Sequence, residues 1–143
     1  MELAGEAGAS DGASLMNLGL ALFDATKTNR AVRKLLAAIE TGKLDAGTLG
    51  TAHAKVGQVY AHSDLEKALE HGHAAVAAAK RDSNPGAMSE PLQLRGLVLR
   101  NLEQFEAALA DYQALAQLHP EHAPIQQVVQ EIHAQIVQSK TEL

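Results

Sequence analysis

Histidine is the residue type in this sequence that could carry metal or acid–base chemistry, because the 143 residues include seven His and no Cys. The absence of Cys excludes disulfides, thiolate metal ligands and a cysteine nucleophile. His71 and His73 are two positions apart, which turns them about 200° from each other on a helix, so they cannot bind one metal ion. His119 and His122 enclose Glu121 at a predicted helix end, but no second ligand cluster accompanies them. Solvent-exposed histidines are therefore favoured over a metal centre.

Motifs that would indicate an enzyme are absent from the sequence. It contains no nucleophile elbow, phosphate-binding loop or zinc-protease motif, and no pair of carboxylates in a recognisable catalytic arrangement. We therefore predict that the protein is not an enzyme and has no catalytic residues, cofactor or bound metal.

The charge balance argues against nucleic acid and anionic lipid as partners. The formal net charge is −5, whereas both partners require clustered Lys and Arg. The longest basic cluster, Arg30, Arg33 and Lys34, has ordinary helix-surface spacing. No apolar run approaches the ~20 residues that span a bilayer, and residues 1–12 lack the features of a secretory signal. We expect a cytoplasmic protein without membrane insertion, in which residues 1–12 form a disordered arm.

Composition predicts an all-α fold. Hydrophobic residues make up 46% of the chain but aromatic residues only 3%. Much of the apolar content is therefore Ala, followed by Leu and Val. Ala and Leu are strong helix formers, while aromatic and β-branched strand formers are scarce.

Three glycines mark an internal repeat. Gly19, Gly57 and Gly96 recur at near-equal intervals, each flanked by apolar residues spaced three and four apart. The residue about twelve positions further on is small or apolar, and the middle repeat leaves the register open (Ala31, Leu69 or Ala68, Ala108). This spacing indicates one buried face per helix. Because mid-helix Gly costs about 1 kcal/mol relative to Ala, three in phase predict close helix packing that offsets this cost.

Turn and cap residues place the helix ends. Gly42 is expected to end the second helix in a left-handed conformation, and Thr48 is expected to start the third. Residues 63–66 (Ser-Asp-Leu-Glu) read as a capping box. Residues 84–86 (Asn-Pro-Gly) predict a plain break, and Ser89 is expected to cap the next helix.

These boundaries predict a single domain over residues 13–139. It comprises three helical hairpins at about 13–46, 49–84 and 89–122 and a capping helix at 124–139. Residues 140–143 are expected to form a frayed tail after the domain. The last helix has one apolar face and a Gln-rich outer face, as the end of a helical stack requires.

The repeats resemble the tetratricopeptide repeat family. The third repeat matches the family pattern best (Leu92, Gly96, Leu99, Ala108, Tyr112, Leu115, Pro120), and the first matches at most positions (Leu15, Leu18, Gly19, Leu22, Ala31, Leu35, Ala38). The second places Gly72 or His73, depending on register, where the family has an aromatic residue. The resemblance implies a right-handed superhelical α-solenoid of three antiparallel hairpins and a C-terminal capping helix, about seven helices in all.

In this family the first helix of each repeat lines a concave groove that binds a partner. The matching positions here extend over all three repeats (Met16, Leu20, Phe23, Asp24; Thr51, Ala54, Gln58, Ala61, His62; Glu90, Gln93, Leu97, Arg100, Asn101). Some members grip a C-terminal carboxylate with Lys, Asn and Arg. Met16, Leu20, Glu90 and Leu97 stand at those positions, and a glutamate would repel an acidic ligand, so we predict no such clamp.

The resemblance implies an adaptor, scaffold or co-chaperone-like module that binds a protein or peptide partner. Met16, Leu20 and Phe23 share one helix face and could hold an apolar anchor or a partner helix. Alternatively, they pack against the N-terminal arm, a second copy or the core. A self-assembling homo-oligomer and a His-based metal or catalytic role remain alternative functions. Leu20→Glu and Arg100→Glu are expected to weaken partner binding.

Overall fold

The protein is all-helical over the residues that its computed structural model describes, which are 12–24 and 28–142. Side chains 13, 14 and 22–24 lie outside that description. Seven α-helices and one short 3₁₀ helix follow one another, with no strand in these two segments: α2 (Gly12–Asp24), α3 (Thr28–Glu40), α4 (Ala46–Tyr60), α5 (Leu65–Ala79), η1 (Pro85–Met88), α6 (Ser89–Asn101), α7 (Phe105–Leu118) and α8 (Ala123–Thr141). The predicted all-α class with about seven helices is confirmed.

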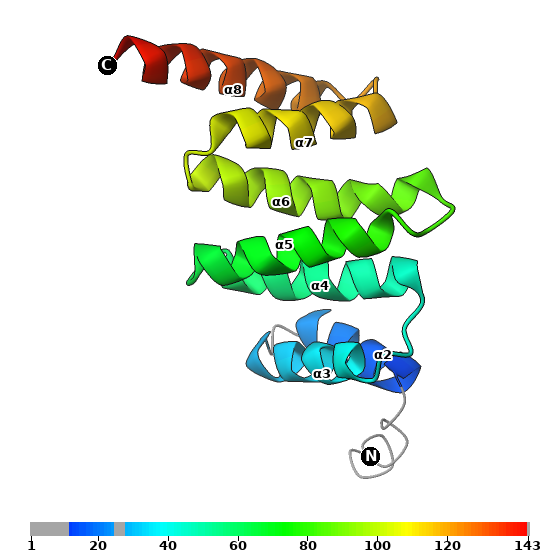
Figure 1. Cartoon of the computed structure of the whole chain (residues 1–143). Helices are drawn as coiled ribbons and strands as arrows, with labels where there is room; N and C mark the ends of the chain where they lie inside the picture. Colours follow the sequence, from blue (N-terminus) through cyan, green and yellow to red (C-terminus); the bar gives the residue numbers. More distant parts are fainter. Residues whose placement is uncertain (1–11, 25–27, 143) are drawn as a thin grey trace.

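The helices are stacked in chain order, with α2 and α3 at one end and α8 at the other (Figure 1). Each helix packs against the next in sequence, and the most extensive contacts are α4 with α5, α2 with α3, and α6 with α7. Helix α4 also contacts α6 across the intervening α5. No helix in the described part of the chain is both long and apolar enough to cross a membrane.

The three repeat glycines lie at the helix crossings. A Cβ added to Gly19 would come within 2.9 Å of the Leu35 side chain on α3, and one added to Gly96 within 2.8 Å of the Tyr112 ring on α7. A Cβ on Gly57 would collide with Leu94 of α6. The predicted close packing at these positions is confirmed.

The structure selects one register for the middle repeat. Ala68 is fully buried and its carbonyl oxygen faces Gly57, whereas Leu69 is only partly buried. Gly72 is buried against Arg95 of α6, while His73 is exposed. The register that keeps Ala68 and Gly72 inside is therefore the one adopted.

The predicted helix end at Gly42 is confirmed, whereas the residues that cap the N-termini of α4 and α5 differ from the prediction. Gly42 has φ +67°, as a left-handed residue after a helix requires. Asp45, rather than Thr48, caps α4: its Oδ1 accepts a hydrogen bond from the Thr48 N–H at 2.8 Å. Asp64 caps α5 by accepting from the Lys67 N–H at 3.1 Å, so the predicted Ser63 cap is displaced by one residue.

The predicted break at residues 84–86 is instead capped and helical. The Asn84 side chain accepts a hydrogen bond from the Gly86 N–H and caps η1, which leads directly into α6. Ser89 is therefore not the expected cap but the first residue of α6, and its hydroxyl contacts His119 instead. At the two ends of the domain, α2 already begins at Gly12 and α8 continues to Thr141, beyond the predicted limits.

Candidate partner-binding site

A hollow of about 410 Å³ lies between α2 and the beginning of α4. We call it the α2–α4 hollow; eight residues line it (Met16, Asn17, Leu20, Asp45, Gly47, Thr48, Thr51, Asp82). Met16 and Leu20 are one turn apart on α2 and so share a helix face. Three of the predicted groove residues, Met16, Leu20 and Thr51, are thus brought together here.

Two of the residues that line the α2–α4 hollow, Met16 and Leu20, are apolar. Met16 is only 4% exposed and Leu20 is half-buried, and both belong to the hydrophobic cluster that α2 forms with α3 and α4. Asn17 is exposed, while Thr48 and Thr51 are half-buried. A lining that combines apolar side chains with polar groups can hold an apolar side chain and fix its orientation.

Two carboxylates meet at the edge of the hollow, beside Gly47. An oxygen of Asp82 lies directly against the position that a Cβ of residue 47 would occupy, and Asp45 Oδ1 is 3.7 Å from that same position. Asp82 reaches it from the loop after α5, where its Oδ1 also accepts a hydrogen bond from the Asn84 N–H at 2.8 Å. A larger side chain at residue 47 would displace the end of the Asp82 side chain from this position.

Both carboxylates lack a cation partner among the described residues, whose ion pairs are Lys55–Glu90, Arg95–Asp111 and Arg100–Glu131. The backbone N–H of Thr48, and then its hydroxyl, lower the pKa of Asp45 below its usual value, so this group is ionised at neutral pH. The edge of the hollow therefore carries negative charge.

Other predicted groove residues are occupied within the chain. Glu90 Oε1 accepts a hydrogen bond from Gln58 at 3.2 Å and pairs with Lys55 at 3.0 Å, which ties α4 to α6. Arg100 bonds Gln135 Oε1 at 2.8 Å and Glu131 Oε2 at 3.1 Å, which ties α6 to α8. Arg100→Glu would break these internal bonds, so it is a poor test of partner contact.

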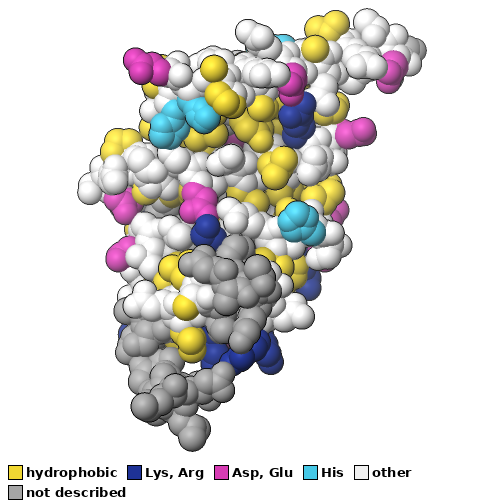
Figure 2. Space-filling model, turned by 180° about the vertical axis from the view of Figure 1, so that it is seen from behind, with side chains coloured by type: hydrophobic (Ala, Val, Ile, Leu, Met, Phe, Trp, Pro, Cys, Tyr) yellow, Lys and Arg dark blue, Asp and Glu magenta, His cyan; other side chains and the backbone are white. Residues whose placement is uncertain are grey.

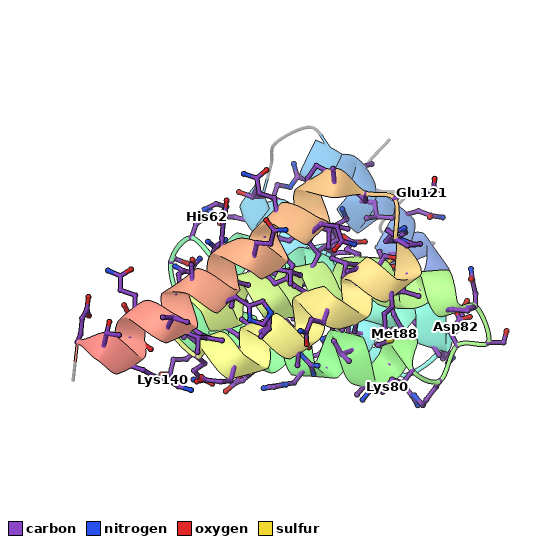
Figure 3. The ribbon with its side chains drawn as sticks, turned by 90° about the horizontal axis from the view of Figure 1, so that it is seen from above. His62, Lys80, Asp82, Met88, Glu121 and Lys140 are labelled. Atoms are coloured by element: carbon purple, nitrogen blue, oxygen red, sulfur yellow. The ribbon has the colours of Figure 1, made fainter. Side chains whose placement is uncertain are left out.

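The remaining predicted residues lie away from the hollow or outside the described side chains. His62 is exposed in the turn after α4, at the opposite end of the helices from Asp82 (Figure 3). Gln93, Leu97 and Asn101 are exposed on α6, with Leu97 at 42%. Ala54 is fully buried and Ala61 half-buried. The side chains of Phe23 and Asp24 are not among those described.

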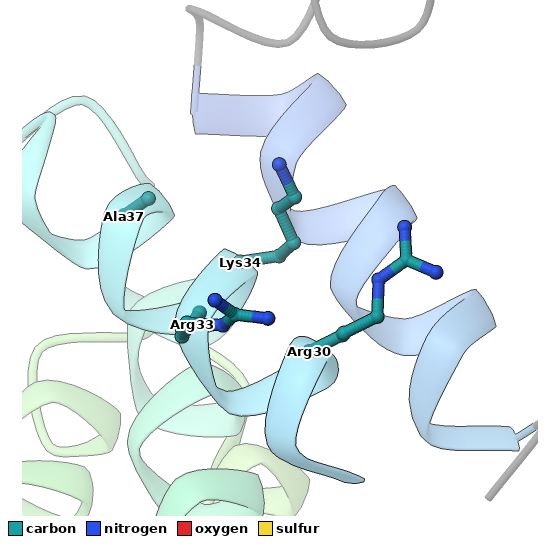
Figure 4. Close-up of a pocket in the computed structure, with 4 residues that line it drawn as sticks. All are labelled: Arg30, Arg33, Lys34 and Ala37. Carbon is teal, nitrogen blue, oxygen red and sulfur yellow. The ribbon is translucent and has the colours of Figure 1, made fainter. Parts of the chain in front are cut away.

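The surface opposite to the view of Figure 1 shows acidic, basic and hydrophobic side chains interspersed over the upper helices (Figure 2). At the α2–α3 end, Arg30, Arg33, Lys34 and Ala37 of α3 line a hollow of about 230 Å³ (Figure 4). Arg30 and Lys34 extend from α3 towards α2, and both already have interaction partners.

A histidine pair across α4 and α5 was not predicted. His53 Nδ1 and His71 Nδ1 are 3.0 Å apart, and the Tyr60 ring stacks on His71. Burial, and then the charge of His71, lower the pKa of His53 to about 4; burial also lowers the pKa of His71. Both rings are thus neutral at pH 7, and one donates its Nδ1–H to the other. The described residues hold no group of three or more metal-binding side chains.

A second contact of catalytic type joins Ser89 and His119. The hydroxyl oxygen lies 2.7 Å from His119 Nε2. A working serine nucleophile also needs a third group to orient its histidine, and within residues 12–24 and 28–142 no carboxylate bonds to His119. The contact instead joins the start of α6 to the corner between α7 and α8.

One buried ion pair explains an irregular residue in the repeat. Arg95 occupies the position before Gly96 where the other repeats have Leu18 and Val56. Its guanidinium bonds both oxygens of Asp111, at 2.8 Å and 2.7 Å, and Asp111 is only 4% exposed. The spacing of apolar residues along α7 does not show that the Asp111 carboxylate is buried, so this pairing could not be predicted from the sequence.

Comparison with known proteins leaves the family open. No known protein-family model matches this sequence. A search of curated proteins found no similar protein either. The resemblance to the tetratricopeptide repeat therefore remains a prediction from the residues themselves.

Proposed function

We propose that this protein is a non-enzymatic binding module, an α-solenoid of tetratricopeptide type, that holds a segment of another protein in the α2–α4 hollow. The observation that carries the proposal is the convergence of Met16 and Leu20 from α2 with Thr51 from α4 around one hollow of about 410 Å³. The resemblance to the tetratricopeptide repeat had already placed these three residues on the expected partner-binding face, without reference to the hollow.

The stacking of the helices supports the solenoid part of the proposal. Successive hairpins pack in chain order, and α4 contacts α6, the first helix of the following hairpin. Repeat proteins of this kind present their first helices side by side on one wall. The three close crossings at Gly19, Gly57 and Gly96 are what such regular stacking needs.

Binding would be driven by burial of an apolar side chain. Fully burying a Leu, Ile or Phe side chain contributes about 1.5–3 kcal/mol, and the hollow offers Met16 and Leu20 as the surface against which it packs. Asn17 and the threonines at the edge provide hydrogen-bonding groups for the backbone of a peptide or helix. No bond is made or broken in this mechanism.

Selection of peptide ligands from a display library on the full chain tests this function. Selected peptides are expected to lose at least about tenfold in affinity, or about 1.4 kcal/mol, when Leu20→Glu places a charge in the hollow. Leu97→Glu is the matched control, because Leu97 is exposed on α6 and does not line the hollow. Peptides that bind Leu20→Glu as well as they bind the unchanged chain would remove the α2–α4 hollow as the binding site.

The alternative of self-assembly rests on the outer face of α8, where Val137 is 63% exposed. Single exposed apolar residues are common on monomers. Sedimentation that shows a monomer throughout the micromolar range would eliminate this alternative.

A further inference from the structure

We infer that the α2–α4 hollow selects partner segments that carry a Lys or Arg close to their apolar anchor. This inference rests on the proposed function and adds the chemistry of the partner. It combines two features of one site: the apolar side chains of Met16 and Leu20, and the carboxylates of Asp45 and Asp82, all of which line the α2–α4 hollow.

The two carboxylates create an electrostatic requirement. Both lie beside Gly47, so their negative charges attract the same cation. Each already uses one oxygen for a backbone N–H, from Thr48 and Asn84 respectively. No Lys or Arg in the described segments forms an ion pair with either aspartate. A cation from a partner would therefore be attracted to this side of the hollow.

The fixed positions of the aspartates make the site directional. Asp45 is held by its role as the N-terminal cap of α4, and Asp82 is held against Gly47 by the turn that its hydrogen bond to Asn84 closes. The two carboxylates are therefore positioned before a partner arrives. An apolar side chain on Met16 and Leu20 would place a neighbouring Lys or Arg near this pair, because all four residues line the same hollow.

Three other occupants fit the charge pattern less well. Residues 1–11 of the chain contain Glu2, Glu6 and Asp11 and no basic residue, so their charge does not complement the edge. A second copy carries the same net charge of −5, and two members of its main basic cluster already have partners.

A calcium ion is the third alternative, and it would require six to eight oxygen ligands. The described residues include no group of three or more acidic or histidine side chains around one point. The two aspartates alone do not provide such a set.

Three fluorescein-labelled nonapeptides of identical length test the inference against the full chain. Each has Leu at the same two positions, and the flanking residues are Lys, Gln or Glu. By fluorescence anisotropy the Lys peptide is expected to bind at least about tenfold more tightly than the Gln peptide at low salt, and the Glu peptide least. The difference should shrink as salt screens the charges.

Two isosteric variants identify the residues responsible. Asp45→Asn keeps the helix cap, since Asn and Asp cap equally well, and Asp82→Asn keeps the acceptor for the Asn84 N–H. Each is expected to reduce the preference for Lys over Gln, and the double variant should abolish it. Glu121→Gln is the control for net charge, because Glu121 is exposed in the loop before α8, away from the hollow.

The outcomes separate the inference from the proposed function. If all three peptides bind equally and Leu20→Glu weakens each of them, the hollow binds partners but the selection of a cation is wrong. If none binds at any salt concentration, both proposals fail. Stoichiometric calcium binding, or a dimer that Asp45→Asn dissociates, would replace the basic partner with another occupant and overturn the inference.

Discussion

Replacing Gly96 with alanine tests the helix packing on which the fold depends. Gly96 lies on α6 where this helix crosses α7. An added Cβ would be 2.8 Å and 3.0 Å from two carbons of the Tyr112 ring and 3.3 Å from Asp111 Cβ. Tyr112 is buried, and Asp111 is fixed by its ion pair with Arg95. Neither residue can move away without disturbing the interface.

The expected magnitude follows from two opposing effects. Alanine in a helix is more favourable than glycine by about 1 kcal/mol. Overpacking a filled interface costs about 1–3 kcal/mol. We therefore expect Gly96→Ala to lower the free energy of unfolding by about 1 kcal/mol, which corresponds to a fall in Tm of about 3–5 °C for a domain of this size.

Urea unfolding followed by far-UV circular dichroism measures this change, with Ala110→Gly as the matched control. Ala110 is exposed on α7, so its substitution reports helix propensity alone and should cost about 1 kcal/mol. The two reciprocal substitutions are thus both expected to destabilise the protein. If Gly96→Ala instead stabilises it by as much as Ala110→Gly destabilises it, the close packing at this crossing is refuted.

Three further predictions concern charged and titrating residues. The pKa of His53 is about 4 when folded and about 6.5 when unfolded, so the unfolded state takes up the proton first. The contribution of neutral His53 to the free energy of unfolding should therefore be fully present above about pH 6.5 and be lost towards pH 4. The loss should be about 1–2 kcal/mol, less than the full pKa shift implies, because solvent screens the half-buried ring. The urea midpoint measured against pH should show this loss, and His53→Gln should reduce the pH dependence. Asp111→Ala should cost about 2 kcal/mol in the same unfolding assay by leaving the partly buried Arg95 without its partner, and a loss below about 1 kcal/mol would show that the pair is not needed. Asp45→Ala should lower the urea midpoint through loss of the hydrogen bond to Thr48, whereas Asp45→Asn should lower it much less because Asn also caps a helix; equal losses would contradict the capping role.

The helix crossings could be predicted from the sequence because a glycine within a helix allows a neighbouring helix to approach closely. Gly19, Gly57 and Gly96 remove the side chain from a helix face that otherwise repeats apolar residues, and the structure places each against a neighbouring helix. The N-terminal caps were harder to predict, since several adjacent Ser, Thr and Asp residues can accept the same hydrogen bonds. Asp45 and Asp64 were selected by backbone geometry that the sequence does not encode locally.

The candidate site could be predicted only in part. Family positions identified Met16, Leu20 and Thr51, which do meet at the α2–α4 hollow. They could not identify Asp82, which comes from a loop after the next helix and reaches the hollow through the turn at Asn84.

The pairing of His53 with His71 likewise depends on how two helices are rotated against each other. Repeat spacing identifies which face of a helix is buried, but not which polar groups on two such helices come into contact.

We propose that a partner segment with an apolar anchor and a basic residue binds in the α2–α4 hollow. The most direct test is to titrate the Lys-flanked Leu peptide into the ¹⁵N-labelled full chain and follow the amide resonances by NMR. We predict that the largest shifts occur at Met16, Leu20 and Thr51 and in the loop that holds Asp82. Shifts confined to the α6 surface around Leu97, with no shifts in the α2–α4 hollow, would show that the peptide binds elsewhere.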